Sequence, residues 1–183
     1  MEELTYRTYV FVERHLSPID KGIQSAHAII EYYNEAKLWN KEEESANFDK
    51  WAHFDKTLIL LDGGTVNDLD ELDEKLTELR IHHGSFRETD LDNILTAIAV
   101  VVDERVYNKE KYLDFDEWVT KEYRDAIMST QEVGCYYNIK TDSSTISISE
   151  DKKPIYYKEW VEFIGGEKNV FLRQFIQNKK LTR

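Results

Sequence analysis

Lys21, Gln24 and His27 bring an ammonium group, an amide and an imidazole to the expected start of a helix, directly after an apolar segment that reads as a strand. Residues three apart share a helix face, so Gln24 and His27 point the same way. In α/β proteins a strand, a short loop and a helix start commonly form a ligand-binding edge. The small residues Ala26 and Ala28 would let a substrate approach closely. This segment is the first candidate for a functional site.

A second group of reactive side chains lies in the acidic segment 88–93, which leads into an apolar strand containing Thr96. A carboxylate from Glu88 or Asp90 could orient water, and Lys21 could stabilise an oxyanion or hold a phosphate. A solvated turn is the alternative for the acidic segment. A divalent cation bound there would need a further ligand from elsewhere in the chain.

Residues of the first helix and of a predicted third strand also have purely structural interpretations. His27 could be a partly buried helix histidine with one satisfied ring nitrogen. Lys21 and Gly22 could simply begin a helix. His82 and His83 alternate along the predicted strand, which points them to opposite faces and argues against joint metal binding.

The charge distribution limits how the chain could meet RNA. The net charge is −12; acidic residues concentrate in 61–105, whereas 168–183 contains only basic charges. An acidic surface disfavours non-specific nucleic-acid binding, because neutralised phosphates supply most of that affinity. An RNA ligand would therefore be bound at local basic positions, by Arg14, Lys21, Arg87 or the C-terminal tail.

The composition predicts a globular protein with one core, or one domain with an appendage. The chain has 183 residues, of which 41% are hydrophobic and 33% are charged. No apolar run approaches the roughly 18 to 20 residues of a membrane helix, and no signal pattern is present, so we expect a cytoplasmic location. Cys135 is the only cysteine, which excludes an intrachain disulfide and gives no context for a nucleophile.

Hydrophobic periodicity predicts an α/β fold for residues 1–105. Strands and helices follow in the order β-α-β-α-β-β, which predicts a small mixed four-stranded sheet with helices on both faces. Asn67 or Asp68 is the expected cap of the second helix, and the polar segment 41–50 is expected to be a surface excursion. The predicted strands cover residues 5–13, 56–61, 81–87 and 95–102, and the predicted helices cover residues 22–40 and 67–80.

Residues 106–183 are expected to form a largely helical C-terminal extension packed on this domain. The segment 107–128 is charged, aromatic and typical of a helix, and 138–149 fits a hairpin or an ordered loop. Gly165 and Gly166 read as a joint before a terminal helix over 167–179.

With these residues in view, residues 5–104 resemble the type-2 peptidyl-tRNA hydrolase family. Residues 24–28, Gln-Ser-Ala-His-Ala, are similar to the family's Gln-x-x-His-Ala signature. The second strand and the Leu-rich helix follow with the family's spacing. Residues 95–99, reached through the acidic loop, are similar to the family's final strand, which is entered through a threonine. The acidic charge and C-terminal addition look like bacteriophage versions of the family.

The resemblance implies an esterase that cleaves the bond between a peptide and the 3′ end of tRNA, with no cofactor and no metal. Whether Glu88 or Asp90 would be the family's acid is open. The implied catalytic residues are Lys21, His27, Glu88, Asp90 and Thr96, and the implied substrate-binding residues are Arg14, Gly22, Gln24 and Arg87.

Two other functions stay open from the sequence. The shortened loop 17–22 and the acidic charge also fit an inactive binding module on the same fold, acting on a host partner in a bacteriophage setting. Its partner could be a nucleic-acid end, or a protein recruited by the basic segment 168–183, and a homodimer is a further possibility. A nucleotide or small-molecule binder at the same strand–helix edge is the third candidate.

Overall fold

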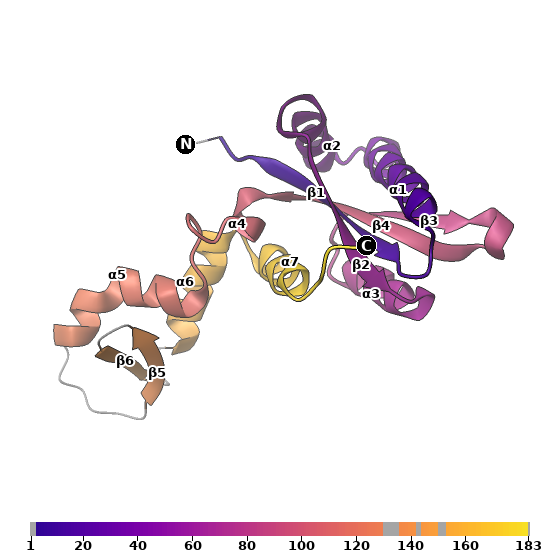
Figure 1. Cartoon of the computed structure of the whole chain (residues 1–183). Helices are drawn as coiled ribbons and strands as arrows, with labels where there is room; N and C mark the ends of the chain where they lie inside the picture. Colours follow the sequence, from indigo (N-terminus) through magenta and orange to yellow (C-terminus); the bar gives the residue numbers. More distant parts are fainter. Residues whose placement is uncertain (1–2, 130–135, 142–143, 150–152, 183) are drawn as a thin grey trace. The chain divides into compact units, whose positions relative to one another are not determined.

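The computed structural model describes residues 3–129, 136–141, 144–149 and 153–182 (Figure 1). The chain divides into two compact units, one formed by residues 1–104 together with 174–183 and the other by residues 105–173. The first unit is therefore built from two separate stretches of sequence. The boundary predicted at 105/106 instead assigned residues 174–183 to the C-terminal extension. Cys135 lies outside the described residues.

The first unit contains the mixed four-stranded sheet predicted from the sequence. Its spatial order is β2-β1-β4-β3, in which β1 and β2 run parallel while β4 runs antiparallel to both β1 and β3. In the register, Val10 lies between Leu60 and Ala99. The strands are β1 (Tyr6–Glu13), β2 (Thr57–Gly64), β3 (Gly84–Glu88) and β4 (Ile94–Asp103).

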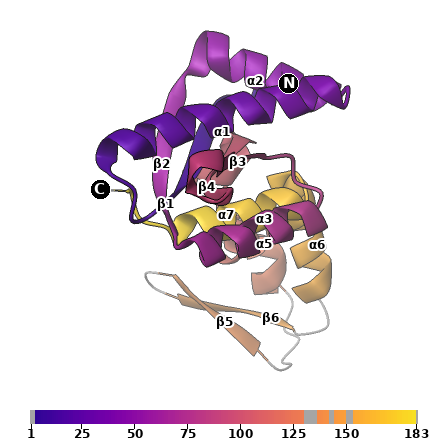
Figure 2. The same ribbon diagram turned by 90° about the vertical axis from the view of Figure 1, so that its right-hand side faces the viewer.

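Helices cover both faces of this sheet, as the α/β prediction required (Figure 2). On one face, Ala28 of α1 (Pro18–Leu38) packs in a cluster with Val10, Val12, Ala97 and Ala99. On the other lies α3 (Val66–Glu78), whose buried residues are Leu69, Leu72 and Leu76.

The segment 41–50, expected to be a surface excursion, contains the helix α2 (Glu42–Lys50), which is followed by the short π-helical segment η1 (Trp51–Asp55). Its acidic first turn and its closing Lys50 complement the helix dipole, and Phe48 packs against Tyr32 and Tyr33 of α1. The predicted cap of α3 is wrong: the N-cap is Thr65, not Asn67 or Asp68, and its side chain accepts the Asp68 N–H in a capping box.

The second unit is mainly helical. A buried cluster joins its helices through Trp118, Val119, Trp160, Val161, Ile164 and Val170. Within the predicted segment 138–149, residues 138–141 and 144–149 lie in two strands that pair antiparallel, and the helix Lys153–Ile164 was not predicted. Gly165 and Gly166 adopt φ values of 93° and 104° between the last two helices, so glycine permits the predicted joint. From residue 104 onward the elements are α4 (Glu104–Tyr107), α5 (Phe115–Ser129), β5 (Tyr136–Thr141), β6 (Ser144–Ser149), α6 (Lys153–Ile164) and α7 (Glu167–Gln177), of which residues 174–177 of α7 belong to the first unit.

Among the described residues, no helix is both long and apolar enough to cross a membrane.

Candidate functional site

The helix α1 begins four residues earlier than predicted, which changes the setting of Lys21. Ser17 is the N-cap: its hydroxyl accepts the backbone N–H of Asp20 and donates to the Asp20 carboxylate at 2.6 Å. Pro18 follows in the first turn, where its missing N–H costs no hydrogen bond. Lys21 and Gly22 therefore lie in the helix, with Lys21 only 7% exposed and Gly22 exposed.

Gln24 connects α1 to both strands of the β3–β4 hairpin. Its amide nitrogen donates to the Glu88 carboxylate at 2.8 Å, and its amide oxygen lies 3.5 Å from the Thr96 hydroxyl. That hydroxyl is also 3.2 Å from the carbonyl oxygen of Phe86. Thr96 is fully buried, so its position suits it to hold Gln24 and β3 in place and keeps it away from a substrate. Gln24, Glu88 and Thr96 thus converge from one helix and two strands.

Glu88 is the carboxylate that Gln24 contacts, whereas Asp90 is exposed in the 3₁₀ turn η2 (Thr89–Leu91). The Gln24 hydrogen bond, assisted by the Asp90 N–H, holds the pKa of Glu88 below its ordinary value. Glu88 is therefore ionised at neutral pH. The Asp90 backbone stabilises this ionised form, and the Asp90 side chain points into solvent.

His27 belongs to the same cluster through Phe86. The two rings stack with 4.4 Å between their centroids and 14° between their planes. His27 is exposed on the outer side of this stack, one helical step beyond Gln24. An accessible imidazole and an ionised carboxylate therefore lie around Gln24, and together they could accept or relay a proton.

A cleft of about 950 Å³ adjoins the start of α1. Arg14 follows β1, Asp62 lies in β2, and Lys21 contributes from α1. The Arg14 guanidinium donates to both oxygens of the Asp62 carboxylate at 3.0 and 3.1 Å. The residues that line the cleft are Arg14, Lys21, Asp62, Lys180, Leu181 and Thr182.

Sequence reasoning did not find Asp62 or Lys180 as parts of this cleft. Burial alone would raise the pKa of Asp62, but the Gly64 N–H and the Arg14 guanidinium outweigh it and lower that pKa. Asp62 is thus a fixed anion that orients Arg14. The sequence did contain a signal for Asp62, because this carboxylate directly follows the apolar run 58–61 of a predicted strand. No signal in the local pattern placed Lys180 there.

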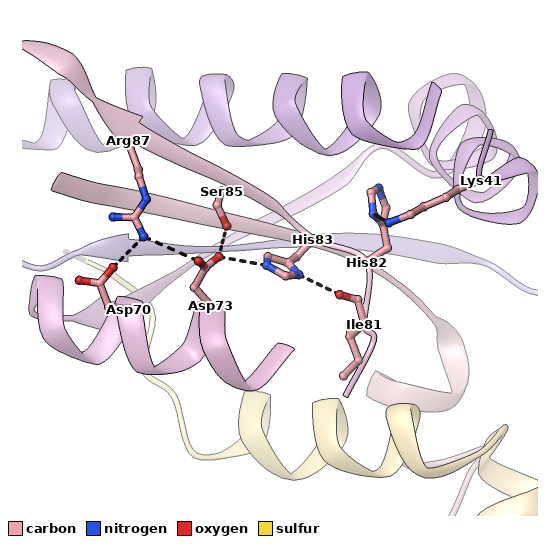
Figure 3. Close-up of polar contacts among 8 residues, drawn as sticks. All are labelled: Lys41, Asp70, Asp73, Ile81, His82, His83, Ser85 and Arg87. Carbon is pink, nitrogen blue, oxygen red and sulfur yellow. Dashed lines mark hydrogen bonds and ion pairs between the residues drawn. The ribbon is translucent and has the colours of Figure 1, made fainter. Parts of the chain in front are cut away.

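Arg87 does not join the Gln24 cluster, because alternation along β3 turns it to the α3 face (Figure 3). Its guanidinium donates to Asp70 at 2.9 Å and lies 3.7 Å from Asp73. Asp73 also accepts hydrogen bonds from the Ser85 hydroxyl and from Nε2 of His83, the latter at 3.0 Å. In a catalytic triad the histidine contacts the serine, but here Asp73 lies between Ser85 and His83. The Ser85 hydroxyl therefore has no imidazole to act as its base, and the cluster is structural.

The pKa values of the adjacent residues His82 and His83 are shifted in opposite directions, and the two side chains contact opposite layers: His82 contacts α1 and His83 contacts α3. Burial alone would lower the pKa of His83, but hydrogen bonds to Asp73 and to the Ile81 carbonyl outweigh it and raise that pKa. Burial lowers the pKa of His82, whose Nε2 donates to the Tyr32 carbonyl while Nδ1 accepts from Lys41 at 2.9 Å.

Replacing His83 by glutamine is expected to destabilise the protein more at pH 5.5 than at pH 8.5. The raised pKa of His83 adds stability that is complete below its ordinary value of 6.5 and is lost as the pH rises through the folded-state value. The lowered pKa of Asp73 adds stability that is present above 3.8 and is lost in stronger acid. The expected cost at pH 5.5 is about 2 kcal/mol, typical of a hydrogen bond between charged groups. Urea unfolding at the two pH values measures it.

The matched control is His82→Gln, because the lowered pKa of His82 gives the opposite dependence. Its cost should be larger at pH 8.5, where both the folded and the unfolded chain hold a neutral ring. Equal costs of His83→Gln at the two pH values would show that the His83–Asp73 contact is not an ion pair.

Within the described ranges, no three His, Cys, Asp or Glu side chains gather closely enough to hold a metal ion.

In comparisons with known proteins, no sequence profile of a protein family matches the chain, and no curated protein sequence matches it.

Proposed function

We propose that the protein is an esterase of the peptidyl-tRNA hydrolase type, which cleaves the ester between a peptide and the 3′ end of tRNA. The observation that carries the proposal is the convergence of Gln24, Glu88 and His27 one helical turn from Lys21, which lines the cleft. These are the positions that the family resemblance nominates. A cytoplasmic location, where tRNA is found, belongs to the same proposal.

The cleft and the Gln24 cluster would contact different parts of such a substrate, the cleft its RNA phosphates and the Gln24 cluster its ester. The cleft carries three basic side chains, of Arg14, Lys21 and Lys180, and one carboxylate that is already bound to Arg14. Its excess positive charge would attract the phosphate groups of a tRNA end in spite of the acidic net charge of the chain.

The Gln24 cluster would carry out the hydrolysis. Glu88, ionised and oriented by Gln24, would position a water molecule beside the ester, and the exposed ring of His27 would accept its proton. Lys21 would stabilise the negative charge that develops on the carbonyl oxygen. Thr96 would act as a positioning residue through Gln24 and the Phe86 carbonyl.

Hydrolysis of an N-acetylated aminoacyl-tRNA tests the proposal. His27→Ala and Lys21→Met are each expected to slow peptide release about 100-fold or more, the effect of losing a general base or an oxyanion donor. Methionine retains the aliphatic length of Lys21, which is largely buried. Release of the acetylated amino acid from radiolabelled tRNA measures the rate, and urea unfolding checks that each variant is folded.

Two control variants remove a cation elsewhere. Lys75→Ala removes an exposed lysine that pairs with Glu78 on α3, and Arg87→Ala removes the arginine on the α3 face. Both should retain wild-type turnover. A wild-type protein that releases no more peptide than the His27 and Lys21 variants would rule out the esterase.

An inactive binding module is the second candidate, and the burial of Lys21 favours it. A lysine that is only 7% exposed is less accessible to the carbonyl oxygen of an ester, whereas the basic side chains of Arg14 and Lys180 still line the cleft. This alternative predicts that the acceptor end of tRNA binds in the cleft without release of the peptide.

A further inference from the structure

The last described residues of the chain extend the sheet of the first unit. After α7 ends, the backbone runs beside β2: the Asp62 N–H donates to the Lys180 carbonyl at 2.9 Å, and the Thr182 N–H donates to the Leu60 carbonyl at 3.2 Å. Leu181 and Leu61 form an antiparallel bridge between these two bonds. Figures 1 and 2 both show this end of the chain beside β1 and β2. We call residues 180–182 the tail strand.

The tail strand is held by its backbone, which leaves its side chains to line the cleft. Both of its hydrogen bonds to β2 are main-chain bonds, so they do not depend on which side chain stands at position 180. Just before it, Phe175 packs edge-on against Phe11 of β1, with ring centroids 5.2 Å apart. The ammonium of Lys179 lies over the Phe175 ring at 4.6 Å. Lys180, in contrast, is exposed and borders the cleft.

The three cations of the cleft come from three unrelated segments. Arg14 follows β1, Lys21 lies in the first turns of α1, and Lys180 comes from the tail strand. Asp62 binds Arg14 from within the cleft, and the Gly64 N–H donates to the same carboxylate at 2.9 Å. The lining therefore keeps an excess of positive charge, and its volume of about 950 Å³ exceeds the needs of a single phosphate.

We propose that Lys180 is a substrate-binding residue that contacts a phosphodiester of the RNA strand, together with Arg14. The inference rests on the proposed function, because it takes the bound strand to be the 3′ end whose ester reaches the Gln24 cluster. A lysine contacts phosphate as a point charge, and its contribution to affinity is sensitive to salt. The tail strand would thereby make RNA binding depend on residues outside the region that resembles the hydrolase family.

The salt dependence of RNA binding tests this role without relying on turnover. The probe is a fluorescent RNA hairpin with a single-stranded 3′-ACCA end, and its association constant is measured by anisotropy over a series of KCl concentrations. Loss of one contact to a single-stranded phosphate should reduce the slope of log K against log salt by about 0.7. We expect this change for Lys180→Gln and not for Lys75→Gln, which removes the same charge from α3.

The outcomes separate the tail strand from the esterase. A Lys180→Gln slope equal to that of the wild type would overturn the role of Lys180, whether or not the protein releases peptide. If the slope falls as expected but the wild type releases no peptide, Lys180 keeps its role and the esterase is refuted. Urea unfolding should give equal stability for Lys180→Gln and the wild type, because the anchoring bonds are main-chain bonds.

Discussion

Replacing Gly84 by alanine is expected to lower the free energy of unfolding of the first unit by about 3 kcal/mol, the upper part of the usual range for an overpacked site. A Cβ at position 84 would lie 2.2 Å from the backbone nitrogen of Tyr32 and 2.3 Å from the carbonyl oxygen of Ala28. These are main-chain atoms of α1, so no side-chain rotation can relieve the contact. The helix must move away from β3 as a body.

The same substitution should disturb the candidate site at a distance. Gln24 lies one turn before Ala28 on α1, and its 2.8 Å bond to Glu88 spans the gap that the alanine would widen. Weakening this bond removes the first cause of the lowered pKa of Glu88, so that pKa should rise toward its ordinary value. Urea unfolding measures the stability, and a carboxyl-selective NMR titration follows Glu88.

Gly22→Ala is the matched control for this experiment. A Cβ at position 22 meets no atom within 4 Å, and the residue lies inside α1. Alanine there should stabilise the helix by up to about 1 kcal/mol, the difference in helix propensity. If Gly84→Ala were as stable as the wild type, the close approach of α1 and β3 would not exist in solution.

Replacing Arg173 by alanine is expected to destabilise the second unit by about 3 kcal/mol, the upper part of the range for losing hydrogen bonds made by a charged group, because a buried guanidinium with three acceptors is removed. Arg173 is only 1% exposed. Its Nε donates to Asp114 at 2.8 Å, and its two terminal nitrogens donate to the carbonyls of Arg105 and Tyr112. Alanine would leave both carbonyls without this donor and would remove the main charge partner of Asp114.

Two further variants separate geometry from charge at this position. The substitution Arg173→Lys keeps the charge but removes the planar fork that reaches three acceptors, so most of the loss should persist. Lys109→Ala removes the other cation beside Asp114, in an ion pair that is about half exposed on each side. It should cost less than about 1 kcal/mol. Thermal unfolding followed by tryptophan fluorescence measures the losses, with Trp118 and Trp160 reporting on the second unit and Trp39 and Trp51 on the first. Equal losses for Arg173→Ala and Lys109→Ala would contradict the bridging role of Arg173.

The sheet could be predicted from the sequence because its strands carry strong local signals. The apolar run in β4 predicted a strand buried on both faces, and all of its residues from Leu95 to Val100 are buried. The start of α1 was misplaced because Ser17 and Pro18 read equally well as loop residues and as a cap with its first turn. The helix α2 was missed because it has one large apolar residue, Phe48, and so shows no apolar stripe. That ring packs against Tyr32 and Tyr33 of α1 and against Trp51.

The candidate site was predictable only in part. Helical spacing placed Gln24 and His27 on one face, but the choice between Glu88 and Asp90 needed the register of the β3–β4 hairpin. The position of Arg87 was open to prediction, since it alternates with Phe86 and Glu88 along β3 and must face the other layer. The contact between Asp62 and Lys180 joins segments far apart in the sequence, and no local pattern encodes it.

The return of the chain to β2 also sets an order of events during synthesis. A ribosome makes β2 early, but the tail strand that pairs with it only after the whole second unit has been made. Until then the outer edge of β2 presents unpaired backbone groups, the feature by which nascent sheets associate wrongly with one another. The first unit therefore passes through a stage with an open edge and an incomplete cleft, which ends only when residues 180–182 reach it.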